Sequence, residues 1–226
     1  MLKKIAMLLV IISAFYPRST AFGDVKASVI HGIPGAIVDV YVNGGLFLPN
    51  FSFGTVTGQV SLSPGVYDIK VYPAGSDPNS SIPILSLMAS LSDGQNVSLV
   101  AHLNGNGGLA LTPFFNDVAA IDNQSGLPPA ATASSRLFVR HVALAPTVSV
   151  VANGKSLFTL SNGTEAGSDI RTHGYAAWLA LPGTKKPVFG PVNLKPQSGN
   201  LSVVYAVGSI QDGSFTVLTQ SIPLSQ

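Results

Sequence analysis

The stretch AIVDVYVNGG, residues 36–45, decides the fold class of this chain of 226 residues. Its even-numbered positions up to Val42 are all apolar, whereas Asp39 falls among the odd-numbered ones. A period of two is typical of an antiparallel strand with one face in the core. Asn43 and Gly44 follow at once, and these residue types supply the positive φ angles that a hairpin turn requires. The stretch therefore predicts a half-buried strand that ends in a tight turn.

The same pattern continues along the chain. Residues 66–72 place aromatic and aliphatic side chains on one face and Asp68 and Lys70 on the other, and residues 97–103 alternate in the same way. Clusters of Gly, Pro, Asn and Ser separate these runs, charged residues make up only 10% of the chain, and no segment has a helical period. About seven short strands in each half of the chain are the pattern of a β-sandwich.

The second half of the chain repeats the first. Short motifs recur in the same order at a nearly constant offset, which is 110 residues from His31 to His141 and 109 residues from Gly54 to Gly163. The matched pairs are Val29-Ile30-His31 with Val139-Arg140-His141, Asn43-Gly44 with Asn153-Gly154, residues 51–58 with 160–167, Gly65 with Gly174, and Pro73 with Pro182. We infer an internal duplication with a single deletion in a loop.

We therefore expect an all-β protein with two tandem immunoglobulin-like antiparallel β-sandwich domains behind an N-terminal signal peptide. Gly126, Pro128 and Pro129 stand among small residues between the repeats, a composition typical of a linker. The expected boundaries are residues 1–21 for the signal peptide, 24–117 for the first β-sandwich repeat, 118–134 for the linker and 135–226 for the second repeat.

The first residues predict export. Lys3 and Lys4 form a positive region, residues 5–16 are almost all apolar, and Ser19-Thr20-Ala21 provides the small residues of a cleavage site. The apolar run is shorter than the ~20 residues that span a bilayer. An uncleaved membrane anchor is the alternative, and the small residues favour cleavage. We expect an exported protein, periplasmic or extracellular, with no membrane span after signal cleavage.

The charge distribution of the sequence bears on its binding partners, and its cysteine content bears on how the fold is stabilised. Of the 12 basic residues, three (Lys3, Lys4 and Arg18) lie in the leader, which leaves nine against the 10 acidic residues. The remaining cations are scattered, whereas nucleic-acid binding needs a clustered basic patch. We therefore expect no nucleic-acid partner. Because the chain has no cysteine, its stability must come from packing rather than disulfides.

Several motifs of the first repeat resemble a known family. They are Val29-Ile30-His31, residues 38–44, Phe53-Gly54-Thr55-Val56 and residues 62–75. With these motifs the chain resembles the domain of unknown function family 4397, closely over residues 26–117 and less closely in the second repeat. The resemblance implies export and tandem immunoglobulin-like sandwiches, and it implies little about activity. The family usually follows its histidine with a loop that contains an acidic residue, whereas this chain has Gly32-Ile33-Pro34-Gly35-Ala36.

Both repeats keep a histidine, His31 and His141, and these are the main candidate site residues. Each could act as a metal ligand or a general base. A histidine at the end of a strand is more often a packed imidazole that is bonded to a loop carbonyl, and we favour this structural role. His102 and His173 lie at no spacing that would join them to one metal ion. We expect no metal and no cofactor.

Trp178 is the third candidate position, either as a core residue or, with Tyr175, as an aromatic platform for a ligand. We favour the core. Catalytic motifs are lacking, because no Gly-x-Ser-x-Gly elbow occurs and Glu165 is the only glutamate.

The leading hypothesis is an exported, non-enzymatic binding or structural module of the cell envelope or extracellular space, with an unknown protein or carbohydrate ligand. One alternative is a secreted hydrolase with an unrecognised site near His31 and His141. A passive structural spacer is the other.

Overall fold

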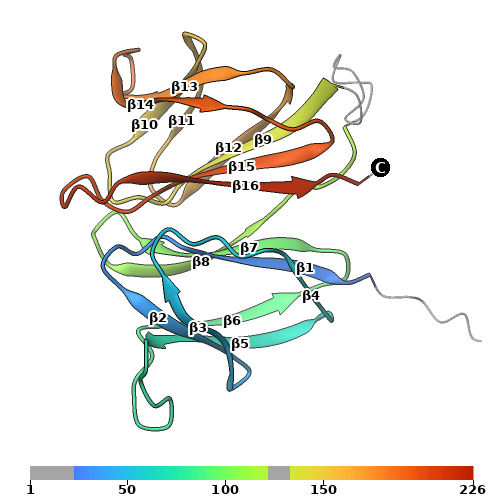
Figure 1. Cartoon of the computed structure of the whole chain (residues 1–226), viewed down its shortest axis with the longest axis vertical. Coiled ribbons are helices and arrows are strands. Elements are labelled where there is room, and N and C mark those ends of the chain that lie inside the picture. The colour runs from blue at the N-terminus through green and yellow to red at the C-terminus, as the bar shows by residue number, and fades with distance from the viewer. Residues whose placement is uncertain (1–22, 122–132, 226) are drawn as a thin grey trace, which may run out of the picture.

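The computed structural model describes residues 23–121 and 133–225, and it shows a nearly all-β chain folded into two sandwiches (Figure 1). The predicted fold class is confirmed. The predicted signal peptide and most of the predicted linker lie outside the described residues. No helix within the described ranges is long and apolar enough to cross a membrane.

The N-terminal domain contains the first eight strands. They are β1 (Val25–His31), β2 (Ile37–Val42), β3 (Gly45–Ser52), β4 (Val60–Leu62), β5 (Gly65–Pro73), β6 (Leu85–Leu91), β7 (Asn96–Leu103) and β8 (Leu109–Phe115). The inner sheet, which faces the other domain, has the order β4-β1-β7-β8, and the outer sheet has the order β3-β2-β5-β6.

The C-terminal domain contains the other eight strands. They are β9 (Ser134–His141), β10 (Val148–Ala152), β11 (Lys155–Leu160), β12 (Thr164–Arg171), β13 (Tyr175–Ala180), β14 (Pro187–Leu194), β15 (Asn200–Val207) and β16 (Thr216–Pro223). Its inner sheet is β12-β9-β15-β16 and its outer sheet is β11-β10-β13-β14. Raising each number of the first domain by eight gives the order of the second, which is the topology that a duplication produces.

Strand pairing is antiparallel except at one place in each domain. β1 pairs in parallel with β7, and β9 pairs in parallel with β15. The predicted turns are present, since Asn43 and Asn153 have positive φ angles of 51° and 47°. Each asparagine also accepts a hydrogen bond through Oδ1 from a backbone N–H of the third strand of its outer sheet.

The structure corrects the sequence alignment of the two copies near Gly65. The Tyr67 hydroxyl donates to the carbonyl of Ser63 at 2.6 Å, and the Tyr175 hydroxyl donates to the carbonyl of Arg171 at 2.9 Å. Such a bond to the backbone a few residues upstream is a tyrosine corner. Tyr67 is therefore equivalent to Tyr175, an offset of 108, so the predicted matches at 109 in this segment (Gly65 with Gly174, Pro73 with Pro182) are wrong by one residue.

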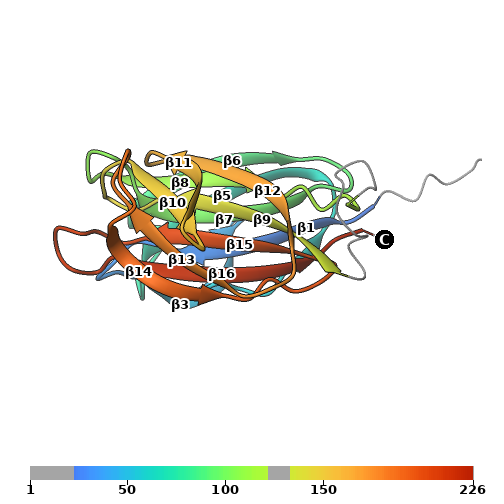
Figure 2. The same cartoon turned by 90° about the horizontal axis from the view of Figure 1, so that it is seen from above.

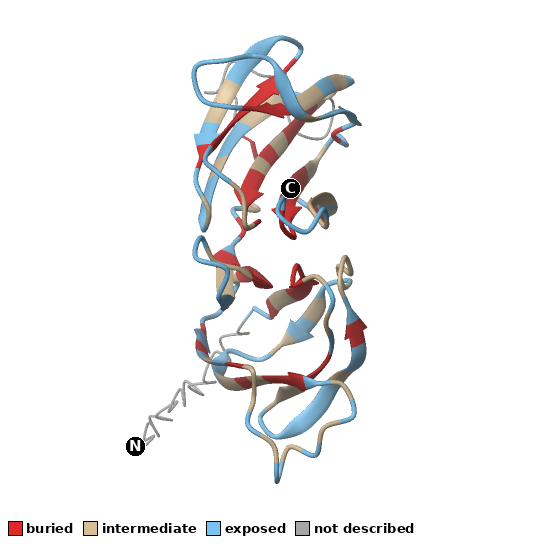
Figure 3. Cartoon of the chain, turned by 90° about the vertical axis from the view of Figure 1, so that its left-hand side faces the viewer, coloured by how far each residue is buried: buried red, intermediate tan, exposed pale blue. Residues whose placement is uncertain are grey.

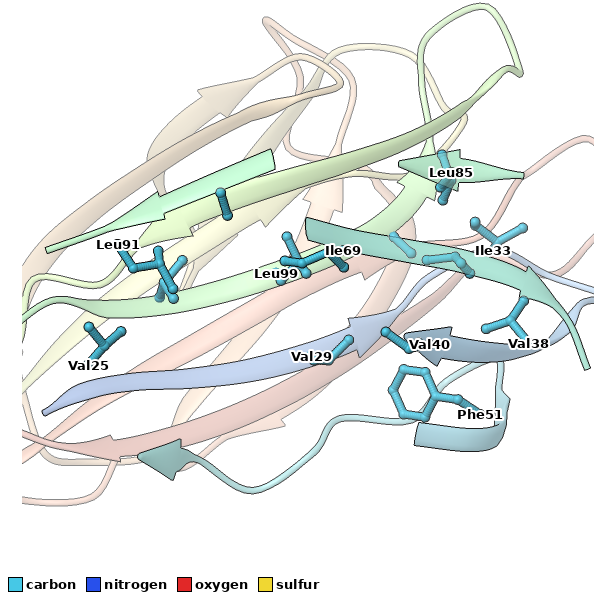
Figure 4. Close-up of a cluster of buried hydrophobic side chains, with 14 residues drawn as sticks. Val25, Val29, Ile33, Val38, Val40, Phe51, Ile69, Leu85, Leu91 and Leu99 are labelled. Carbon is cyan, nitrogen blue, oxygen red and sulfur yellow. The ribbon is translucent and has the colours of Figure 1, made fainter. Parts of the chain in front are cut away.

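Each sandwich has its own apolar core. In the N-terminal domain Val29 and Leu99 of the inner sheet face Val40 and Ile69 of the outer sheet (Figure 4). The corresponding core of the C-terminal domain is built around the pair Val139 and Val150. Burial of these apolar faces, at roughly 25 cal/mol for each Å² removed from water, stabilises both sandwiches in the absence of disulfides.

A third apolar cluster lies between the domains, whose inner sheets pack face to face in the middle of the molecule (Figure 1). It joins side chains from both inner sheets and from the segments that flank them. Its fully buried or nearly buried members are Ile30, Val100, Phe114, Ile121, Val142, Leu201, Val203, Tyr205, Val207, Ile222 and Leu224.

Because of this third cluster, the inner strands are more buried than their sequence pattern predicts. Residues 97–103 were expected to be half-buried, yet β7 is buried on both faces, with Ser98 and Val100 fully enclosed. The alternation of apolar and polar residues remains, but the second domain covers the face that was expected to meet water. Figure 3 shows buried segments on both sides of the region where the domains meet.

Candidate functional site

The most unusual side chain of the molecule is Arg140, because its charged group is fully buried between the domains. It lies on β9 at the position where the first copy has Ile30, one residue before the histidine that both copies share. Alternation along the strand turns Arg140 toward the other domain and His141 toward the core of its own sandwich. An unpaired buried cation is very costly, so the surroundings of Arg140 must supply partners.

Three hydrogen-bond acceptors surround the guanidinium. Nε donates to Glu165 at 2.8 Å from the neighbouring β12, and Nη1 donates to the Tyr205 hydroxyl at 3.0 Å from β15. Nη2 donates to Oδ1 of Asn116 at 2.7 Å, and this acceptor belongs to the N-terminal domain. Arg140 is therefore bound simultaneously by both domains.

Aromatic rings cover the faces of the guanidinium. The Phe114 ring of the N-terminal domain lies 4.7 Å from the guanidinium carbon, and the Tyr205 ring lies 5.3 Å from it. These are cation–π distances, and such contacts are stronger where water is excluded. Burial raises the pKa of Tyr205 above its usual value, although the nearby Arg140 lowers it by a smaller amount. The Tyr205 hydroxyl consequently stays protonated.

The network continues across the domain interface. The Tyr205 hydroxyl lies 2.8 Å from Oε1 of Gln220 and 3.0 Å from Oγ of Ser98, and Nε2 of Gln220 donates to Oγ of Ser28 at 2.9 Å. Asn116 in turn donates to Ser98 at 3.0 Å. We call this set the interdomain polar cluster; its members are Ser28, Ser98 and Asn116 from the N-terminal domain and Arg140, Glu165, Tyr205 and Gln220 from the C-terminal domain.

Backbone contacts hold the domains together beside this cluster. The Gly208 N–H donates to the Gly32 carbonyl at 3.3 Å. A Cβ atom on Gly32 would lie 2.9 Å from Val207, so glycine is what allows this close approach. Asn162 donates to the carbonyl of Leu103 at 2.9 Å from the opposite domain.

His31 and His141 occupy equivalent positions, and both are buried. In each, Nδ1 accepts a hydrogen bond from the backbone N–H two residues later, at 3.2 Å from Ile33 and 3.4 Å from Ala143. Nε2 of His141 lies 2.9 Å from the carbonyl oxygen of Pro146. Nε2 of His31 completes no such bond within the described part of the chain.

Burial changes the acid–base properties of these imidazoles. It lowers the pKa of His31 to about 4, and the backbone of Ala36 raises that pKa by a smaller amount. Burial also lowers the pKa of His141 and of His102. All three imidazoles are therefore neutral at pH 7. The structure brings neither His102 nor His173 into a shared site with them, and the described ranges contain no group of three or more residues of the kind that could hold a metal ion.

Trp178 lies on the outer face of β13, opposite to the core residue Leu179. Its indole N–H donates to the carbonyl of Lys185 at 2.8 Å and so holds the loop between β13 and β14. His173 stacks near Tyr175, with ring centroids 4.1 Å apart, rather than near Trp178. Tyr175 and Trp178, the two aromatic residues of the hypothetical ligand platform, thus point to opposite faces of the strand. The favoured prediction that Trp178 is a core residue is wrong as well, because strand alternation turns its half-buried side chain away from the core.

The interdomain polar cluster was not predicted from the sequence. The available signal was a cationic residue in place of Ile30 within an otherwise matching motif, together with the only glutamate at residue 165. Nothing in the sequence paired either residue with Tyr205 or Asn116, because those partners come from other strands and, for Asn116, from the other domain.

Comparisons with known proteins agree with the predicted family. The family model described as Domain of unknown function (DUF4397) matches residues 25–151, which include all of the N-terminal domain and extend into β10. No curated protein matches the chain. Among the solved structures that match is the Bacillus anthracis TIE protein, with 9% sequence identity and a TM-score of 0.24. The alignment covers 83% of this chain, which spans about half (51%) of that protein.

The matched residues make up more than half of the chain, and they contain the motifs in which the resemblance was first seen. The chain therefore belongs to the DUF4397 family.

Proposed function

We propose that the protein is an exported, non-enzymatic module of the cell envelope or extracellular space, in which two sandwiches form one rigid body that binds a protein or carbohydrate partner. The observation that carries this proposal is the interdomain polar cluster around Arg140. It lies within an apolar interface, so the two domains are fastened together by oriented hydrogen bonds as well as by packing. A hinged pair of domains would leave this arginine without Asn116.

The surroundings of the histidine and glutamate side chains also support a non-enzymatic role. The imidazoles of His31 and His141 are enclosed and neutral, and the Nδ1 atom of each binds its own backbone. A general base must reach its substrate within hydrogen-bond distance, directly or through one water. Glu165 neutralises Arg140 rather than facing a second carboxylate, whereas glycoside hydrolysis uses two carboxylates across one bond.

The rigid-body part of the proposal is tested with the full chain in solution. We expect the small-angle X-ray scattering profile of the wild type to fit the compact two-domain arrangement, and Arg140→Ala to give a larger radius of gyration. A wild-type profile that requires a broad ensemble of domain orientations would contradict the proposal.

The binding and export parts need separate measurements. Co-sedimentation of the purified chain with isolated cell walls tests binding, and bovine serum albumin serves as the non-binding control. Fractionation of the native host tests export. Hydrolysis of model esters that is lost in His141→Ala while the fold is retained would favour the hydrolase alternative instead.

A further inference from the structure

The C-terminal domain holds an apolar cavity of about 190 Å³ between its two sheets. Its walls come from every strand of the domain and are almost entirely aliphatic or aromatic. Its lining residues include Ala152, Ala177, Val192, Val204 and Thr219. The equivalent cavity of the N-terminal domain measures only about 80 Å³. Two copies of one fold thus differ by more than a factor of two in internal space.

The larger volume has an origin in the sequence. Strand pairing identifies four lining positions where the second copy has lost side-chain carbon atoms relative to the first. They are Val42 to Ala152, Ile69 to Ala177, Phe47 to Leu157 and Leu99 to Val204. The replacement of Ala27 by Leu137 and of Ala89 by Leu194 offsets part of the gain. Since unfilled space costs stability, a retained void of this size is more easily explained by a ligand than by packing.

The cavity opens at one edge of the sandwich. In the N-terminal domain β6 packs against β8 and closes this edge, whereas the equivalent β14 and β16 make no comparable contact. β14 and β16 are the last strands of their sheets and lie at the same side of the domain (Figure 2). Val192 and Thr219, which line the cavity, are exposed at this edge.

A second, polar pocket of about 220 Å³ adjoins the mouth of the cavity. The two spaces share Asn193, Leu194 and Thr219 as lining residues, so they lie next to each other at the edge between β14 and β16. The remaining lining residues of the polar pocket are Lys195, Gln197, Ser202, Val203, Gln220 and Ser221. Lys195 is the single charged residue among them, and within residues 23–121 and 133–225 it forms no ion pair.

We propose that the cavity and the polar pocket form one binding site for an anionic amphiphile, with its hydrocarbon chain in the cavity and its carboxylate beside Lys195. An apolar chain matches walls that offer almost no hydrogen-bond partners. A charged head matches a pocket that offers amides, hydroxyls and one unpaired ammonium group. A purely apolar ligand would leave the polar pocket unused, and a free anion would leave the cavity empty.

The volume sets the chain length. An apolar cavity of ~150 Å³ accommodates one benzene ring, that is six carbon atoms. By the same ratio the cavity of about 190 Å³ holds roughly seven carbon atoms. Octanoate, whose chain beyond the carboxylate has seven carbons, is therefore the best-matched straight-chain probe.

Titration calorimetry of the full chain with straight-chain carboxylates from butanoate to dodecanoate tests the proposal. Each added methylene should tighten binding roughly fourfold, which corresponds to ~0.8 kcal/mol for each buried CH₂. The gain should stop near octanoate because longer chains no longer fit. Octanol should bind equally to wild type and Lys195→Gln, whereas octanoate should bind more weakly to Lys195→Gln.

Two filling variants serve as matched controls. Ala177→Ile and Val204→Leu restore the side chains of the first copy, and neither should lower the melting temperature. Ala177→Ile adds three carbon atoms to the wall and should weaken octanoate binding roughly 60-fold, whereas Val204→Leu adds one and should weaken it roughly fourfold, at ~0.8 kcal/mol for each displaced CH₂. The second variant keeps the test decisive if isoleucine at 177 disturbs folding. Absence of octanoate binding to the wild type at millimolar concentration would overturn the proposal, as would unchanged binding in Val204→Leu. Binding only to phosphatidylglycerol vesicles, without binding of monomeric octanoate, would overturn it as well.

Discussion

Replacing Arg140 with alanine is expected to destabilise the whole protein. The guanidinium is fully buried and donates to Glu165, Asn116 and Tyr205 at 2.7–3.0 Å. Removing one partner of a buried ion pair costs about 3–5 kcal/mol. The Glu165 side chain is 30% exposed and can be hydrated after the change, so we expect the lower end, about 3 kcal/mol. That is a large part of the roughly 5–15 kcal/mol by which native domains are stable.

Urea unfolding measures this loss. Far-ultraviolet circular dichroism follows both domains, and fluorescence follows Trp178, the only tryptophan, in the C-terminal domain. Lys70→Ala, which removes an exposed ion pair with Asp68, is the matched control and should leave the midpoint nearly unchanged. A loss below about 1 kcal/mol for Arg140→Ala would mean that the buried guanidinium stabilises the protein no more than a single exposed ion pair does, contrary to the expected result.

Three further predictions concern the histidines and the leader. Burial lowers the pKa of His31 from 6.5 to about 4, so the unfolded chain binds more protons at this imidazole between these values. The contribution of His31 to stability should be complete above pH 6.5 and fall by about 3 kcal/mol toward pH 4. His141 and His102, whose pKa values burial also lowers, add to the loss, so His31→Gln should reduce this pH dependence without removing it. His141→Ala should cost about 1–3 kcal/mol by leaving the Pro146 carbonyl unpaired, and a chelator should not change the melting temperature of the wild type. A chelator-dependent shift in the wild type alone would contradict this metal-free assignment. Intact-mass measurement of exported protein should show cleavage after Ala21, and recovery only as a full-length membrane protein would contradict export.

Local sequence patterns were sufficient to predict the strands and turns. Alternation over residues 36–42 and the Asn43-Gly44 turn depend on neighbouring residues, and the structure places a strand and positive φ angles there. The duplication was visible for the same reason, because each copy repeats its turn chemistry. The alignment of the two copies was wrong by one residue near Gly65, because a glycine can occur at several positions of a turn. The hydrogen bond of the tyrosine corner, by contrast, marks one equivalent position in each copy.

Features that depend on contacts between distant segments could not be predicted from the sequence. Alternation on β7 predicts only a half-buried strand, and it cannot reveal that a second sheet covers the face on which the fully buried Ser98 lies. The sequence placed Arg140 only within a repeated motif, because its partners Asn116 and Tyr205 come from other segments of the chain. The apolar cavity of the C-terminal domain likewise depends on how two sheets separate at an edge, which no local period encodes.

Scanning calorimetry of the full chain tests most directly whether the two sandwiches form one body. If the interdomain polar cluster and the apolar interface couple the domains, the wild type should unfold in one transition with equal calorimetric and van't Hoff enthalpies. Arg140→Ala should lower the melting temperature and broaden or split this transition. Two independent transitions in the wild type, unchanged in position by Arg140→Ala, would contradict the account.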